Sequence, residues 1–173
     1  MTMQYDVKQS HQNQSGFFVL GRFRVKGLTF SGTSGSAGQI VLFDTVTAPV
    51  SASVTYGRSG TTVTVTKTAH GLLTGDTVGI HFVAGTGGSA TDGNYTITRT
   101  SADAFTLEDI NSGNITASPA AVYCSTGNWL LTQEPASTDV FNNFNLIPGE
   151  GILAKNGIYG YMVNIQSASI YYG

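Results

Sequence analysis

Short apolar runs separated by loops of Gly, Ser and Thr recur along the whole chain, a pattern typical of β-proteins. Residues 22–26 alternate charged and apolar side chains, which predicts a strand with Phe23 and Val25 on its covered face. The apolar run Gln39–Asp44 predicts a strand that is covered on both faces. Three further strands are predicted after a turn at 148–151, over residues 151–154, 157–163 and 169–172. No segment predicts a long helix.

The middle of the chain differs from its two outer parts. Residues 55–125 hold 15 of the 23 threonines, whereas the outer segments carry most of the aromatic residues. Short alternating runs at even spacing, bounded by glycine turns, predict a small β-sandwich or barrel in this region. We therefore predict an all-β protein in which 1–54 and 126–173 form a discontinuous outer β-sandwich. The segment 55–125 is then an inserted Thr-rich β-module.

Composition narrows the range of functions. The 173 residues include 22 Gly but only 8 Lys plus Arg and 10 Asp plus Glu, so 10% are charged and the net charge is −2. These numbers argue against coiled coils, and the scattered cations argue against a nucleic-acid partner. No window is apolar enough for a transmembrane helix, so we expect no membrane partner. The first residues lack the pattern of a secretory signal, so we expect no secretory signal peptide.

Residues with catalytic or metal-binding potential are few and scattered. His11, His70 and His81 have no zinc-ligand spacing, and Cys124 has no partner for an internal disulfide and no nucleophile motif. The stretch 85–88 is rich in glycine but lacks the Gly-Lys-Ser/Thr ending of a phosphate loop. We therefore expect no enzymatic activity, no cofactor and no metal site.

Two groups of residues are candidates for a protein interface. The cations at 22–26 form a local basic stripe, which is either a solvated strand face or a contact with an acidic neighbouring subunit. The late tyrosines are either interface anchors or ordinary strand residues. The candidate interface residues are Arg22, Arg24, Lys26, Tyr159, Tyr161, Tyr171 and Tyr172.

The central segment resembles a β-module of bacteriophage virion proteins, especially tail proteins. The residues that carry this resemblance are Ala-His-Gly-Leu at 69–72, Gly-Asp at 75–76, Gly-Asn-Tyr-Thr-Ile at 93–97 and Phe-Thr-Leu at 105–107. In that family the module is a spacer or an interaction module without catalytic activity. The outer segments are similar to small phage structural proteins through 5–9, 24–27, 148–152 and 171–173.

The resemblance implies a non-enzymatic structural protein of a phage virion, assembled in the cytoplasm of the bacterial host. Its most specific form is a capsid decoration or cement protein that stabilises the head, forms a homo-oligomer and projects the β-module. The expected partners are the major capsid protein or tail proteins. One alternative is a tail component, such as a fibre or adaptor-associated subunit. Another is a surface module that binds a host glycan, for which Trp129 and the late tyrosines supply the aromatic rings.

Overall fold

The computed structural model describes residues 7–116, 118–138 and 143–173 of the chain. Strands make up 57% of the protein and the described residues contain no helix, so the predicted all-β class is confirmed. No helix capable of crossing a membrane therefore occurs in this part of the chain. The chain divides into two compact units, which we call unit 1 (Met1–Val46 with Leu130–Gly173) and unit 2 (Thr47–Trp129).

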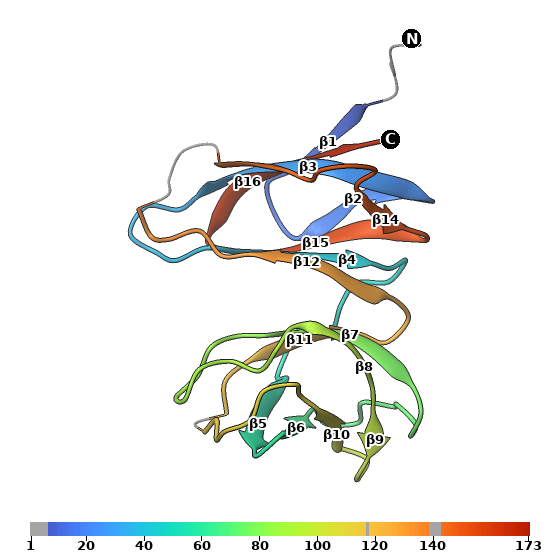
Figure 1. Ribbon diagram of the computed structural model, residues 1–173, viewed down its shortest axis with the longest axis vertical. Helices are drawn as coiled ribbons and strands as arrows, with labels where there is room; N and C mark the ends of the chain where they lie inside the picture. The colour runs from blue at the N-terminus through green and yellow to red at the C-terminus, as the bar shows by residue number, and fades with distance from the viewer. Residues whose placement is uncertain (1–6, 117, 139–142) are drawn as a thin grey trace. The chain divides into compact units, whose positions relative to one another are not determined.

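Unit 1 is a sandwich of two antiparallel sheets, which form the two layers seen in Figure 1. Sheet A has the strand order β1-β16-β3-β13, and β14 also pairs with β3. Sheet B has the order β12-β4-β15-β2. The strands of unit 1 are β1 (Lys8–Gln12), β2 (Gly16–Leu20), β3 (Phe23–Gly32), β4 (Gln39–Asp44), β12 (Asn128–Gln133), β13 (Asn143–Leu146), β14 (Ile152–Ala154), β15 (Gly157–Val163) and β16 (Ile165–Tyr172).

The two sheets of unit 1 share one apolar core. Leu28 and Ile170 from sheet A and Ile40 and Ile158 from sheet B are fully buried in a single cluster. Such side chains each contribute roughly 1.5–3 kcal/mol on burial. Side chains alternate between the two faces of a strand. The side chains that do not face this core therefore lie on the opposite faces of sheets A and B.

A buried carboxylate fixes the turn between β14 and β15. Asp44 is 2% exposed and accepts backbone N–H groups from Lys155, Asn156 and Gly157 at 2.7–3.2 Å. Of the three donors, the N–H of Gly157 is buried, and losing the acceptor would leave it unpaired at a cost of about 1–3 kcal/mol. The last residue of β4 therefore holds the turn through which the chain passes from β14 in sheet A to β15 in sheet B.

Unit 2 also contains two antiparallel sheets around a core of its own. Sheet C has the order β11-β7-β8 and sheet D the order β5-β6-β10-β9. Isolated backbone bridges from Thr55 to Ala120 and from Arg58 to Ile115 pair β5 of sheet D with the segment that leads into β11 of sheet C. Both sheets contribute to one buried core. The strands of unit 2 are β5 (Thr55–Ser59), β6 (Thr62–Thr66), β7 (Thr77–Phe82), β8 (Gly93–Thr96), β9 (Thr98–Arg99), β10 (Ala104–Glu108) and β11 (Ala121–Cys124).

The unit boundaries lie eight and four residues outside the range 55–125 that composition indicates. Val50 exchanges two backbone hydrogen bonds with Tyr123, and Val54 is buried in the core of unit 2. Composition does not reveal these residues, because they precede the threonine-rich stretch and act through pairing with a segment about 70 residues away.

Unit 2 enters the chain between β4 and β12, which are neighbouring strands of sheet B. Antiparallel neighbours can be joined by a loop of only two residues. The insertion therefore replaces a hairpin loop, and the strands of sheets A and B lie outside it apart from the first two residues of β12.

We predict that unit 1 folds without the insert. Replacing residues 47–127 by a short Asn-Gly-containing turn should leave a soluble protein with a cooperative thermal transition and dispersed NMR signals, because its core is complete. Circular dichroism and an amide NMR spectrum provide the measurement. A non-cooperative product would show that unit 1 depends on unit 2 for its fold.

Candidate interaction surface

The outer face of sheet A, which is the face turned away from the core of unit 1, presents a regular array of side chains. The strand register aligns residues of β1, β16, β3 and β13 across the sheet, with neighbouring strands about 4.8 Å apart. Two rows result: Gln9, Tyr171, Gly27 and Leu146 form one, and His11, Ser169, Thr29 and Phe144 form the other. None of these eight residues is Asp, Glu, Lys or Arg.

A shallow polar depression of about 210 Å³ lies on the β1 and β16 side of this face. His11 Nδ1 lies 3.0 Å from Ser169 Oγ at its floor, and Ser169 is 6% exposed. The structure gives no protein hydrogen-bond partner, among the described residues, to the side chains of Gln9, Thr29 and Ser167. The depression is lined by Gln9, His11, Thr29, Phe30, Ser167, Ala168, Ser169 and Tyr171.

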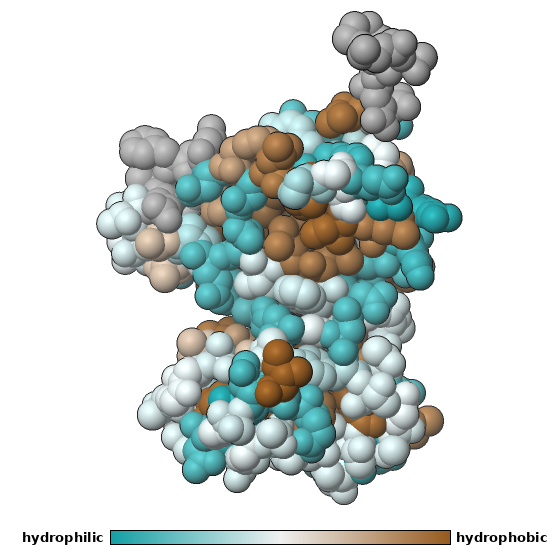
Figure 2. Space-filling view, in the orientation of Figure 1, coloured by the Kyte–Doolittle hydropathy of each residue, from teal (hydrophilic) through white to brown (hydrophobic). Residues whose placement is uncertain are grey.

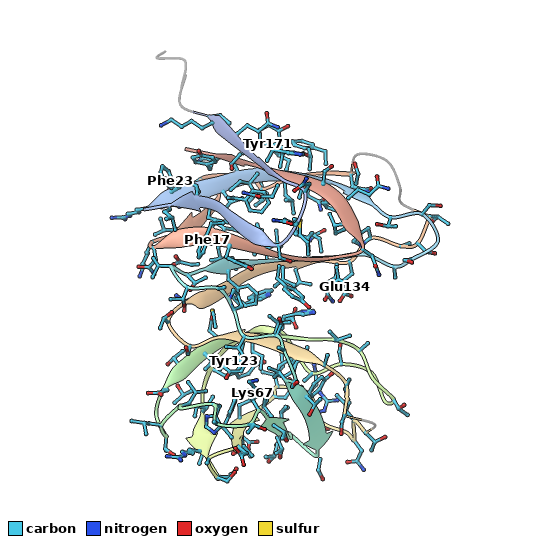
Figure 3. The ribbon with its side chains drawn as sticks, turned by 180° about the vertical axis from the view of Figure 1, so that it is seen from behind. Phe17, Phe23, Lys67, Tyr123, Glu134 and Tyr171 are labelled. Carbon is cyan, nitrogen blue, oxygen red and sulfur yellow. The ribbon has the colours of Figure 1, made fainter. Side chains whose placement is uncertain are left out.

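Aromatic and aliphatic side chains border the depression on the β13 side. Tyr171, labelled in Figure 3, makes an edge-to-face contact with Phe144, with ring centroids 6.0 Å apart. Phe144 is 58% exposed and Leu146 is 69% exposed. A Cβ atom at Gly27 would lie 3.3 Å from the Phe144 ring, so the glycine makes room for this ring. The face therefore combines uncharged polar groups with an exposed apolar border.

A second surface of unit 1 lies at the open side of the sandwich, between the edge strands of the two sheets. We call it the lateral apolar strip, and it consists of Leu130, Leu131, Ile147 and Ile152, all half-buried against the core. Asn145 Nδ2 donates to Gln133 Oε1 at 2.6 Å, which brings β13 beside β12 at one end of the opening. Figure 2 shows apolar residues exposed on unit 1 between the two layers.

The structure gives two cations of the predicted basic stripe a local role. Arg24 forms a 3.2 Å ion pair with Glu150, and Lys26 Nζ donates to the Glu150 carbonyl oxygen at 2.7 Å. These contacts hold the 148–151 turn against β3. Arg22 takes part in neither contact; together with Phe23 and Arg24 it lines a depression of about 200 Å³.

The four candidate tyrosines lie on different surfaces. Tyr159 and Tyr161 alternate with Ile158 on β15 and so occupy the face of sheet B opposite the core; burial raises the pKa of both hydroxyls. Tyr171 lies on the outer face of sheet A, whereas Tyr172 packs on the core and against Phe23 at 5.0 Å. Of the seven candidate residues, only Tyr171 belongs to the outer face array.

Trp129, the candidate aromatic residue for glycan binding, is the second residue of β12 and is half-buried. Asn94 holds its backbone, because the side-chain amide of Asn94 accepts from Trp129 N at 2.8 Å and donates to Trp129 O at 3.3 Å. The backbone of residues 128–129 also crosses close to Gly79, where a Cβ atom would lie 2.2 Å from Trp129 N. The surroundings of Trp129 therefore reflect strand packing within unit 2.

The buried ionisable groups of unit 2 form pairs that tie its loops together. Arg58 and Asp109 form an ion pair whose side chains are 6% and 1% exposed. Asp109 also accepts the N–H groups of Thr91 and Asn111, while Arg58 donates to the Gly113 carbonyl. Burial raises the pKa of Asp109, but hydrogen bonds from Thr91, Asn111 and Arg58 outweigh this effect, so the pKa lies below its ordinary value.

His81 and Asp92 form the second buried pair. His81 Nδ1 lies 2.6 Å from Asp92 Oδ2, and Asp92 Oδ1 accepts the N–H of Phe82. The histidine is 1% exposed although it faces away from the core of unit 2. The described residues contain no group of three or more His, Cys, Asp or Glu side chains that could hold a metal ion. The pair thus fixes the segment around Asp92 to β7.

Gln9, His11, Thr29, Ser167 and Ser169 are not among the residues that the sequence indicates for an interface. These residues gather only when β1 and β3 both pair with β16. The sequence pattern that could have indicated them is the alternation at 166–172, where polar Ser167 and Ser169 alternate with buried Ala168 and Ile170. That pattern indicates a polar face but not its neighbours.

Comparisons of the chain with protein-family models, with curated proteins and with solved structures found no match.

We predict that replacing Asp109 by Asn lowers the stability of unit 2 by roughly 3 kcal/mol at pH 7, because it breaks a buried pair. The pKa of Asp109 is lowered in the folded state, so its stabilisation is complete above the ordinary pKa of 3.8. It is lost as the pH falls through the lowered folded-state value. The difference between the variant and the natural protein should therefore shrink below pH 4.

Urea unfolding, followed through the NMR signals of Val65 and Phe105 in the core of unit 2, measures this difference at each pH. Glu108→Gln is the control, because Glu108 is an acid beside Asp109 whose hydrogen bonds from Thr61 and Thr62 are exposed to water, and it should change stability by less than about 1 kcal/mol. A penalty for Asp109→Asn that is as large at pH 2.5 as at pH 7 would contradict the assignment.

Proposed function

We propose that the protein is a non-enzymatic structural subunit of a bacteriophage virion, and specifically a decoration protein that binds the capsid shell. The resemblance of residues 69–107 to a virion β-module supports the virion role. The lateral apolar strip is the single observation that supports docking through unit 1, because its four side chains are only half-covered by their own core.

The strip is suited to a protein partner. Fully burying a Leu or Ile contributes roughly 1.5–3 kcal/mol, and covering the exposed part of each side chain recovers a fraction of that. The strip also lies between β12 and β13, which end their respective sheets. Edge strands have unpaired backbone groups that a neighbouring chain can use. A capsid subunit or a second copy of this chain would cover both features together.

The distribution of charge fits a contact of this kind. Strip residues carry no charge, and the nearby cations Arg24 and Lys26 are engaged by Glu150. Interface cores are depleted of charged residues, so this surface resembles the centre of an interface more than an electrostatic docking site.

Unit 2 serves as a projecting module in this proposal. It has its own buried core and joins unit 1 through two chain connections that enter and leave between neighbouring strands. Loops tolerate insertions of folded domains at such positions. Unit 1 can therefore dock while unit 2 extends the surface of the particle.

We expect purified protein to bind phage heads that lack it and to raise their melting temperature. Ile152→Thr and Ile147→Thr should weaken binding at least tenfold, because each places a hydroxyl in the strip while keeping a β-branched side chain. Ile110→Thr is the matched control, since Ile110 is 82% exposed and belongs to unit 2. Co-sedimentation and calorimetry of the heads provide the measurements.

The copy number per particle distinguishes the virion roles. Hundreds of copies correspond to head decoration, whereas six, twelve or eighteen would assign the protein to the tail instead. Absence from purified particles, or equal binding by the strip variants and the control, would overturn the proposal in its present form.

A further inference from the structure

We propose that the polar depression on the outer face of sheet A binds a neutral sugar unit of a glycan, with Tyr171 as the ring that packs against it. The lateral apolar strip is a separate surface, so this inference goes beyond the virion role and does not depend on it. The charge, the free polar groups, the size and the rigidity of the depression support this assignment.

The charge of the depression selects a neutral ligand. None of its eight lining residues is Asp, Glu, Lys or Arg. The nearest cation in sequence, Lys8, alternates with Gln9 and His11 along β1 and so lies on the opposite face of the strand. Phosphates and carboxylates are recognised by Arg, Lys or helix N-termini, and the described residues contain no helix. A nucleotide or an acidic peptide therefore lacks a partner here, whereas an uncharged polyol does not.

The free polar groups of the depression match hydroxyl groups. The Gln9 amide both donates and accepts, and the Thr29 and Ser167 hydroxyls can do either. No protein partner engages these three side chains within the described part of the chain. His11 uses Nδ1 toward Ser169, so Nε2 is available on the same side. A sugar ring presents donors and acceptors of the same kind at short spacing.

Tyr171 supplies the apolar part of the site. Its ring is half-buried and held by the edge contact with Phe144, so it has a fixed orientation beside the polar groups. The face of an aromatic ring carries partial negative charge and attracts the C–H groups on one side of a pyranose. Small-ligand sites usually combine aromatic or apolar side chains with a few well-placed hydrogen-bonding groups.

The size and rigidity of the site also fit one sugar unit. Its volume of about 210 Å³ is below the roughly 300–1,000 Å³ of drug-sized ligand pockets. The side chains come from three hydrogen-bonded strands with defined register, so little ordering is needed on binding. A longer glycan would continue along the face toward Phe144 and Leu146, which are exposed.

The test is an NMR titration of the full chain with three neutral hexasaccharides: maltohexaose, cellohexaose and chitohexaose. We expect at least one of them to shift the amide signals of β1, β16 and Thr29, while heparin, an acidic glycan, shifts none of them. Tyr171→Ala and Gln9→Ala should each weaken that binding at least fivefold. Gln14→Ala is the matched control, because Gln14 is an equally exposed glutamine outside the depression.

Gln9→Ala and Ser167→Ala keep the test decisive if Tyr171→Ala disturbs the sheet, since both change only unpaired surface groups. Absence of shifts with all three neutral probes at 10 mM would overturn the proposal. Shifts that persist unchanged in Gln9→Ala and Ser167→Ala would also overturn it, and would place the sugar elsewhere, for example at Trp129. Shifts of the same signals with protein concentration alone would identify the face as a self-association surface instead.

Discussion

The antiparallel pairing of β3 with β16 is the interaction on which unit 1 depends. β3 is a ten-residue strand that also pairs with β13 and β14, and β16 pairs with β1. Leu28 opposite Ile170 places two fully buried side chains at the centre of this pairing. Because the partners lie about 140 residues apart in the chain, forming the pair closes a very long loop. High contact order of this kind is associated with slow folding.

The same pairing creates the surfaces that we connect with function. Its inward residues build the core of the sandwich, and its outward residues set the two rows on the outer face of sheet A. The side opening of the sandwich leaves four half-buried apolar residues in the lateral strip. Unit 1 therefore offers an apolar surface suited to a protein and an uncharged polar surface suited to a sugar. A particle protein that docks on one side can use the other for attachment.

Buried polar groups stabilise loops in both units. Asp44 holds the β14–β15 turn in unit 1, and Asp109 with Arg58 holds the segments around 91 and 111–113 in unit 2. Each carboxylate accepts backbone N–H groups, which keeps a buried charge satisfied. These residues account for much of the buried polar chemistry, and their contacts are those of structural rather than reacting groups.

Hydrophobic alternation by itself determined the all-β class, the strand at Gln39–Asp44 and the three final strands, because a period of two depends only on local backbone geometry. Composition located the insert only to within eight residues, since Val50 and Val54 join it through long-range pairing. The residues of β1 are polar, so their own sequence does not predict a strand. The segment is a strand because it pairs with β16. Likewise only the tertiary structure decided that Tyr171 shares a face with Gln9 and Thr29, because strand neighbours are set by the packing of the whole core rather than by the residues themselves.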